Sequence, residues 1–308
     1  MTTPITNRSR FAFCAPPGTW INDPVPFYEP STGVYHLYLQ HNPAAPLDAD
    51  KHWLHVSSRD CLSWTNHGVA LAPSRVSGDS DVGGVWTGCV TQRGDGVYVA
   101  LYTAIPTYKP FTQVQCAALS HDLHTWEKVP GIVTGLSHQP EGYGGCFRDP
   151  QTFLLGDKYY CIIGGERRNG QGGAAFLYEA TDDTLLSWQY SHVLYEGDTA
   201  TGHDFECPDF FPLPNADKWC LLTSREKSWW HLGTLNPDSL QFERESFGAC
   251  DDESRYAAKS CVGADGERLV WFWVRDAGGE ADGWSGALDH PRRVSLSADG
   301  KAVEFAPV

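Results

Sequence analysis

The stretch SSRDCLSW at Ser57–Trp64 is repeated along the chain, and this repetition decides the fold class. Two further copies are LSHDLHTW at Leu119–Trp126 and TDDTLLSW at Thr181–Trp188. The tryptophans that end the three copies are evenly spaced, because 126 − 64 and 188 − 126 both equal 62. A weaker fourth copy, NPDSLQF at Asn236–Phe242, ends in phenylalanine. Regular internal repeats indicate a fold assembled from one recurring supersecondary unit.

Runs with strand character surround these copies. GVYHLYLQHN, GVYVALYTA and KYYCIIGGE are rich in aromatic and β-branched residues and are bounded by turn-forming residues. No stretch of comparable strength has helical periodicity. A unit of about four strands that recurs every 55–62 residues predicts an all-β fold, a five-bladed β-propeller with a central funnel-shaped active site. The units begin near residues 20, 84, 146, 204 and 254. A β-sandwich with coincidental tryptophan spacing is the alternative.

Composition and charge limit the partners. The chain of 308 residues has 31 glycines, 20 prolines and 41% hydrophobic residues, which favours strands joined by turns around a sizeable core. Its net charge of −15 repels phosphate backbones, so nucleic acid is excluded as a partner and a neutral ligand is favoured. No apolar stretch of 18 residues exists, so we expect no membrane span.

The cysteines and histidines show no metal-ligand spacing. The ten cysteines form no Cys-x-x-Cys pair, and the 12 histidines follow no regular ligand pattern, so we predict neither a metal site nor a cofactor. The N-terminus lacks the apolar segment of a signal peptide. We therefore expect reduced thiols and a cytoplasmic protein, or a secreted one if a signal was trimmed.

Three carboxylates and one tryptophan share one phase of the repeat. Counted back from the aromatic residue that ends each copy, the separations are 41 for Asp23, 40 for Trp86, 39 for Asp149 and 36 for Glu206. The first strand of every propeller blade lines the central channel, so residues at equal phase face one another there. We therefore expect these four side chains to converge.

The sequence around each acid is similar. Asp23 lies in WINDPVPFY, Asp149 in CFRDPQTF and Glu206 in DFECPDFF, so each acid has a nearby proline and apolar neighbours. One such motif alone is well explained as a turn. Apolar surroundings raise the pKa of a carboxyl, and different environments allow two carboxyls to divide acid and base roles. Paired carboxylates with aromatic walls suggest glycosidic chemistry on a small neutral sugar.

At these motifs the chain resembles glycoside hydrolase family 32, the invertase, inulinase and levanase group. The resemblance is carried by Trp-Ile-Asn-Asp-Pro at Trp20–Pro24, Arg-Asp-Pro at Arg148–Pro150 and Glu-Cys-Pro at Glu206–Pro208. It continues through YHLYLQHNP, VWTGCV, RYAAKS, RLVWFWV and GWSGALDHPR in the expected order. The motifs therefore cover nearly the whole chain.

The resemblance implies a role for each residue. It makes Asp23 the nucleophile, Glu206 the general acid and base, and Asp149 the stabiliser of the transition state. It also implies a fructose subsite lined by Asn22, Gln40, Trp53, Trp86, Thr87 and Arg148. The implied activity is that of a retaining β-fructofuranosidase that acts on sucrose or short fructo-oligosaccharides and needs no cofactor.

Two departures from the family pattern leave alternatives open. Val25-Pro26 follows Asp23-Pro24 where the family often has Asn-Gly. A proline after Asp-Pro also occurs among fungal-type fructosyltransferases of the family. The chain stops at Val308, so we expect residues 1–308 to form a single propeller domain without the usual C-terminal β-sandwich, and a homo-oligomer is possible. The alternatives are a fructosyltransferase, a non-catalytic fructan-binding propeller and an inverting arabinose-type glycosidase.

Overall fold

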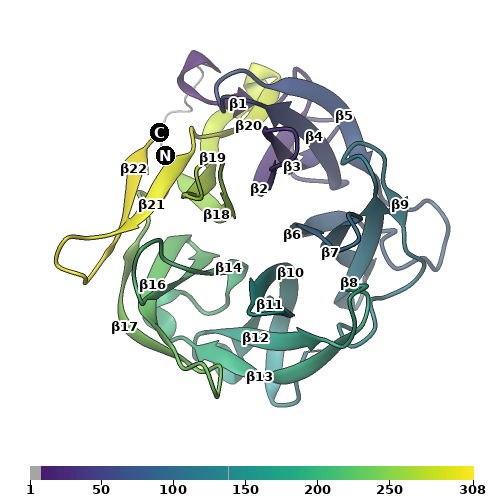
Figure 1. Ribbon diagram of the computed structural model, residues 1–308. Helices are drawn as coiled ribbons and strands as arrows, with labels where there is room; N and C mark the ends of the chain where they lie inside the picture. Colours follow the sequence, from purple (N-terminus) through teal and green to yellow (C-terminus); the bar gives the residue numbers. More distant parts are fainter. Residues whose placement is uncertain (1–7, 138) are drawn as a thin grey trace.

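The computed structural model describes residues 8–137 and 139–308, and almost every element in this part of the chain is a strand. Twenty-two strands are accompanied by four short 3-10 helices, which confirms the predicted all-β fold. The helices are η1 (Arg8–Arg10), η2 (Arg168–Gly170), η3 (Thr199–Thr201) and η4 (Glu280–Asp282). In the described residues, no helix has the length and apolar character to cross a membrane. Figure 1 shows the strands grouped in a ring.

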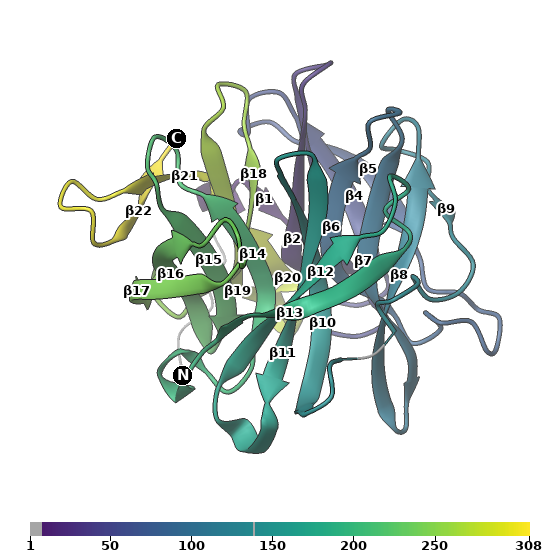
Figure 2. The same ribbon diagram turned by 60° about the horizontal axis from the view of Figure 1, so that its bottom comes forward.

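Three sheets are four-stranded and antiparallel, with successive strands as neighbours. The first contains β6 (Val85–Gln92), β7 (Tyr98–Tyr108), β8 (Phe111–Ser120) and β9 (Glu127–Lys128). The second contains β10 (Tyr143–Leu155), β11 (Lys158–Arg167), β12 (Gly173–Ala180) and β13 (Trp188–Glu196), which come forward in Figure 2. The third contains β14 (Glu206–Pro212), β15 (Trp219–Arg225), β16 (Lys227–Leu235) and β17 (Phe242–Ala249).

The fourth sheet has ten strands and joins both ends of the chain. Its early strands are β1 (Phe13–Cys14), β2 (Trp20–Glu29), β3 (Val34–Asn42), β4 (His52–Ser58) and β5 (Thr65–Leu71). Its late strands are β18 (Arg255–Val262), β19 (Arg268–Gly279), β20 (Trp284–Leu288), β21 (Arg292–Leu296) and β22 (Val303–Pro307). The two groups meet where β20 pairs with β1 and, in parallel, with β2 at Trp20 and Ser285.

The strands β2, β6, β10, β14 and β18 lie nearest the centre of the ring (Figure 1). They begin within about three residues of the predicted starts of the five repeat units. Each has a register shift against its neighbour close to its first residues, between Ile21/Pro24, Val85/Gly88, Arg148/Gln151, Glu206/Asp209 and Tyr256/Lys259. A β-bulge redirects side chains and frequently lies next to an active site. Every inner strand therefore has a β-bulge at an equivalent position.

The repeated Asp-Leu-Trp motif forms the turn before the outermost strand of its sheet. The side chains of Asp60, Asp122, Asp182 and Asn236 each accept a hydrogen bond from the backbone N–H two residues later. Such side-chain turns are a known preference of Asp and Asn. The tryptophans that follow contact the hydrophobic core, and Trp188 is buried there. The repeat is therefore structural.

All ten cysteines are free thiols, and nine of them are buried. Cys261 is partly exposed. Most of them lie in hydrophobic core clusters, where a thiol packs as a small apolar group.

Candidate active site

A cavity of about 240 Å³ lies at the inner strands and collects the three acids identified from the sequence. All five inner strands and their neighbours contribute lining residues: Asn22, Asp23, Gln40, Asp48, Lys51, Trp86, Arg148, Asp149, Glu206, Tyr256 and Trp273. A cavity of this size suits one small polar ring.

Asp23 lies in the bulge of β2 and is only 8% exposed. Its Oδ2 accepts hydrogen bonds from the Thr87 hydroxyl at 2.6 Å, the Gln40 amide at 3.1 Å and the Cys207 thiol at 3.4 Å. Burial raises the pKa of Asp23, and the hydrogen bond from Thr87 opposes that rise. These donors therefore favour the ionised carboxylate, whereas burial favours the neutral form.

Asp149 lies in the bulge of β10 and is 2% exposed. Its backbone has a φ of +63°, and its N–H donates to the Thr103 hydroxyl at 2.7 Å. Its Oδ2 accepts the backbone N–H of Cys207 at 2.7 Å. Burial raises the pKa of Asp149 to about 6, although the nearby Arg148 guanidinium opposes the shift. A left-handed backbone at a non-glycine residue costs about 1 kcal/mol or more and is concentrated at functional sites.

Glu206 begins β14 and is held by three donors. Arg148 contacts Oε1 at 2.6 Å and Arg225 at 3.4 Å, while the Tyr256 hydroxyl donates to Oε2. The adjacent Cys207 has a φ of +48° and contacts both aspartates, as described above. The strained start of β14 thus connects Glu206 to Asp23 and Asp149, which are 126 residues apart in the sequence.

A lysine and an indole form another wall of the cavity. The Lys51 ammonium lies 4.7 Å from the ring centre of Trp20 and 5.1 Å from that of Trp86. Burial lowers the pKa of Lys51 to about 8, against the attraction of the cavity acids. The rings also stabilise the ammonium through cation–π contact.

Several polar atoms of the cavity lining have no partner among the described residues. They are Asn22 Oδ1, Gln40 Oε1, Trp86 Nε1 and Trp273 Nε1. A buried polar atom without a hydrogen bond destabilises the folded state, so such atoms usually bind a ligand or a water molecule. The hydroxyl groups of a sugar can both donate to and accept from this set.

The structure brings most of the predicted residues together. All three acids line the cavity, as do Asn22, Gln40, Trp86 and Arg148. Thr87 is fully buried and reaches Asp23 instead of the cavity surface.

Trp53 is not on the cavity wall, contrary to the sequence prediction. It is 0% exposed and packs in a hydrophobic core against Tyr38 and Tyr102. Its indole N–H donates to the backbone carbonyl of Trp86 at 2.9 Å. Trp53 therefore supports the strand that carries Trp86.

The sequence analysis missed Lys51, Tyr256 and Asp204. Asp204 is buried and contacts Arg148 at 2.8 Å and Arg225 at 3.0 Å, so it fixes both arginines that face Glu206. Tyr256 lies just before the bulge of β18, and extending the phase argument to the fifth unit would have found it. No comparable signal marks Lys51, which precedes an ordinary strand.

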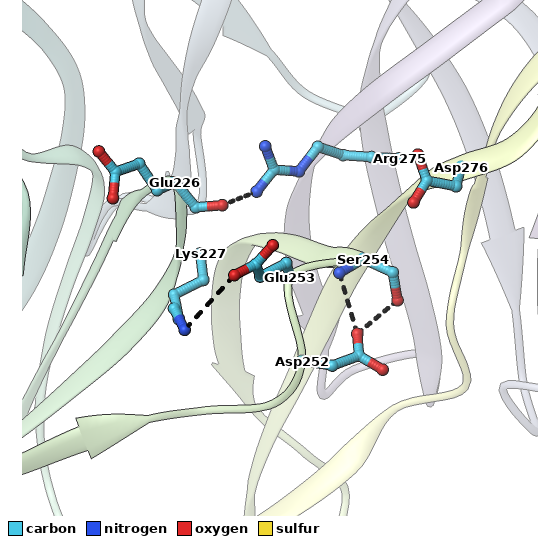
Figure 3. Close-up of a pocket in the computed structure, with 7 residues that line it drawn as sticks. All are labelled: Glu226, Lys227, Asp252, Glu253, Ser254, Arg275 and Asp276. Carbon is cyan, nitrogen blue, oxygen red and sulfur yellow. Dashed lines mark hydrogen bonds and ion pairs between the residues drawn. The ribbon is translucent and has the colours of Figure 1, made fainter. Parts of the chain in front are cut away.

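A larger cavity of about 710 Å³ lies beside Tyr256 and differs in character. Its residues are drawn in Figure 3, where Arg275 donates to the carbonyl of Glu226 and Lys227 faces Glu253. The Arg275 guanidinium lies 4.0 Å from the ring centre of Tyr256, which separates this cavity from Glu206. Asp252, Glu253 and Glu226 are exposed, so the larger cavity has no buried pair of acids.

Comparison with known protein families shows to which family the chain belongs. The family model described as the glycosyl hydrolases family 32 N-terminal domain matches residues 13–307. The chain belongs to this family. The resemblance inferred from the motifs is thus confirmed, and the family 32 chain is assigned to the glycoside hydrolases.

Relatives of the family 32 chain include raffinose invertase from Escherichia coli. The two are 30% identical over 94% of this chain and 63% of the relative. The insoluble β-fructofuranosidase isoenzyme CWINV2 from Arabidopsis thaliana is 30% identical over 98% of this chain and 55% of the relative. The chain therefore spans less than two thirds of the length of these relatives.

Solved structures resemble the family 32 chain over nearly its whole length. A mutant of the β-fructofuranosidase BmSUC1 from Bombyx mori, solved in complex with sucrose, has a TM-score of 0.82 and 27% identity, covering 99% of this chain and 66% of that one. Fructan 1-exohydrolase IIa from Cichorium intybus has a TM-score of 0.82 and 28% identity, covering 99% and 61%.

Proposed function

We propose that this chain is the catalytic domain of a retaining β-fructofuranosidase that cleaves the fructosyl bond of sucrose or short fructans. The observation that carries the proposal is the convergence of Asp23, Asp149 and Glu206 on one small cavity. Family membership and the invertase and fructan exohydrolase relatives support the same substrate class. The acidic surface also suits a neutral saccharide.

In the first step, the ionised Asp23 carboxylate attacks the anomeric carbon of the fructosyl unit. Glu206 donates a proton to the glycosidic oxygen as its bond to that carbon breaks, and the remaining sugar leaves as an alcohol. The product is a covalent fructosyl-enzyme on Asp23. The donors from Thr87 and Gln40 keep the attacking carboxylate ionised before the bond forms.

In the second step, Glu206 acts as a base. It removes a proton from water, the water oxygen bonds to the anomeric carbon, and the ester bond to Asp23 breaks. Asp149 holds sugar hydroxyls, and its position is fixed by the Cys207 N–H and the Thr103 hydroxyl. Retention requires the two reacting carboxyls to be about 5–5.5 Å apart. The contacts of Cys207 with Asp23 and Asp149, next to Glu206 in the chain, support such proximity.

We further propose that the ring is a five-bladed propeller with the site at the mouth of a central funnel. In this interpretation the ten-stranded sheet contains the first and fifth blades, joined by the pairing of β20 with β2. The five equivalent bulges at the inner strands support one blade for each repeat unit.

Incubation of the purified protein with sucrose, inulin and levan, followed by product separation, tests the activity. Release of fructose supports hydrolysis, whereas trisaccharides at high sucrose concentration indicate fructosyl transfer. Mass spectrometry of a trapped fructosyl adduct then tests the mechanism. An adduct on Asp23 supports retention and excludes an inverting glycosidase. Binding of these sugars without turnover would contradict the proposal and favour a non-catalytic propeller.

A further inference from the structure

Outside the active site, four histidines from separate elements gather beside one another. His36 lies on β3, His55 on β4, His67 on β5 and His124 in the connection between β8 and β9. One ring nitrogen of each of His55, His67 and His124 lies within 4.8 Å of those of the other two. The ring centres of these three residues are 4.5–4.9 Å apart. We call His55, His67 and His124 the histidine cluster.

The hydrogen bond between His55 and His36 leaves the second ring nitrogen of His55 without a partner. His55 is 1% exposed, and its Nε2 lies 2.9 Å from Nδ1 of His36. The other nitrogen of His36 faces Glu29 at 3.7 Å, beyond hydrogen-bond length, and we assign its proton to that side because the carboxylate attracts it, which leaves Nδ1 as an acceptor. His55 then donates through Nε2, and its Nδ1 carries a lone pair. That Nδ1 has no hydrogen-bond partner among the described residues.

The surroundings hold these side chains in place. Tyr38 stacks on the His55 ring with centres 4.7 Å apart, and its hydroxyl donates to the carbonyl of Leu123 at 2.6 Å. The Asp122 carboxylate accepts the backbone N–H of His124 at 2.8 Å. The segment that carries His124 is thereby fixed against β3 and β4. No sequence motif marks this arrangement, because the three histidines of the cluster come from three separate elements.

We propose that the histidine cluster binds one divalent transition-metal ion of the kind that imidazole prefers, such as Zn²⁺ or Co²⁺. Three imidazole ligands with a water in the fourth position form a common tetrahedral coordination sphere. A histidine ligand usually has a partner on its second nitrogen that orients it, and Glu29 and His36 supply that relay for His55. Because His67 and His124 are exposed, an ion reaches the site directly from solvent.

The ion would connect two sheets. His55 and His67 belong to the ten-stranded sheet, whereas His124 belongs to the sheet of β6–β9. Figure 1 shows β5 and β9 as neighbouring outer strands. A ligand that binds only the folded protein raises its stability in proportion to the logarithm of ligand concentration. The ion therefore acts as a clip at the outer edge, separate from the catalytic cavity.

Titration of the metal-free protein with Co²⁺, without a polyhistidine tag, tests the site. We expect one equivalent to bind with the visible absorption of a tetrahedral nitrogen site and without a sulfur charge-transfer band. Zn²⁺ at about 100 times its dissociation constant is expected to raise the thermal unfolding midpoint by a few degrees.

Three variants and a matched control make the test specific. His67→Ala and His124→Ala remove exposed ligands and are expected to weaken Co²⁺ binding more than 100-fold and to abolish the Zn²⁺-dependent thermal shift. Glu29→Gln disturbs the orienting relay, together with the hydrogen bonds that Glu29 accepts from Thr32 and Tyr98, and is expected to weaken binding about 10- to 100-fold. His121→Ala, an exposed histidine of the same connection, is expected to bind like the unmodified protein. Absence of saturable Co²⁺ binding by the unmodified protein would overturn the proposal. So would Co²⁺ binding by the His67→Ala and His124→Ala variants that is as tight as that of the unmodified protein.

Discussion

Replacing Thr87 by valine removes the shortest hydrogen bond to the proposed nucleophile without opening a large cavity. The Thr87 hydroxyl donates to Asp23 Oδ2 at 2.6 Å, and both residues are buried. A hydrogen bond to a charged group contributes about 1.5–3 kcal/mol. Gln40 at 3.1 Å remains as a donor, so we expect the lower end of that range. Since about 1.4 kcal/mol corresponds to a factor of ten, the ionised form of Asp23 becomes about tenfold less favourable.

The direction of the effect on pH dependence follows from this loss. The hydrogen bond from Thr87 opposes the burial that raises the pKa of Asp23, so its removal raises that pKa further. The acidic limb of kcat/KM against pH therefore moves to higher pH, with about a tenfold loss on the acid side and a smaller change on the plateau.

The assay is the initial rate of sucrose cleavage measured across the pH range, with a buried threonine elsewhere as control. Thr223→Val removes a hydroxyl that lies 3.1 Å from His231, away from the cavity, and is expected to leave the profile unchanged. If the acidic limbs of Thr87→Val and the unmodified enzyme coincide, Thr87 does not lower the pKa of Asp23 and the reasoning is refuted.

The remaining predictions concern the acids and the two tryptophans. Asp23→Asn or Glu206→Gln is expected to lower kcat by orders of magnitude while circular dichroism and thermal unfolding show an intact fold; near-normal turnover in either variant contradicts the assigned roles. Asp149→Asn is expected to increase the free energy of unfolding at pH 7.5 by about 1–3 kcal/mol, because a pKa raised from 3.8 to about 6 means that ionisation destabilises the folded chain above that pH. Urea unfolding should show this gain vanish near pH 4, and an equal gain at both pH values would be inconsistent with it. Trp53→Phe is expected to lower the free energy of unfolding by about 1–3 kcal/mol and to leave KM unchanged. Trp86→Phe is expected to raise KM with little effect on the free energy of unfolding. The reverse pattern would contradict the placement of Trp53 in the core and of Trp86 on the cavity wall.

The sequence predicted the strands because its turn chemistry is regular. The Asp or Asn of each repeat forms the same side-chain turn, so the tryptophan spacing measures the length of one unit. The pairing of β20 with β2 was not predictable in this way, since no local pattern reports which distant strands become neighbours. It merges the first and last groups of strands into one sheet.

The acids of the site were predictable because they lie at equal phase, but the supporting residues were not. Trp53 pairs in register with Gln40, whose side chain reaches Asp23. Trp53 nevertheless lies in the hydrophobic core and does not line the cavity. Alternation along a strand indicates on which face of the sheet a side chain lies, but it does not indicate which side chains on that face line the cavity. Lys51 was missed for a related reason, because its proximity to the cavity depends on how a connection folds over Trp86.

The pairing of Trp20 with Ser285 has a consequence for how catalytic competence arises during folding. These residues are 265 positions apart, and contacts of such separation form slowly because a long loop must first be closed. A nascent chain that has emerged only as far as residue 250 already contains Asp23, Asp149 and Glu206, but it still lacks the hydroxyl of Tyr256 and the strands that join its two ends. Refolding experiments should therefore show enzyme activity returning later than most of the β-sheet signal.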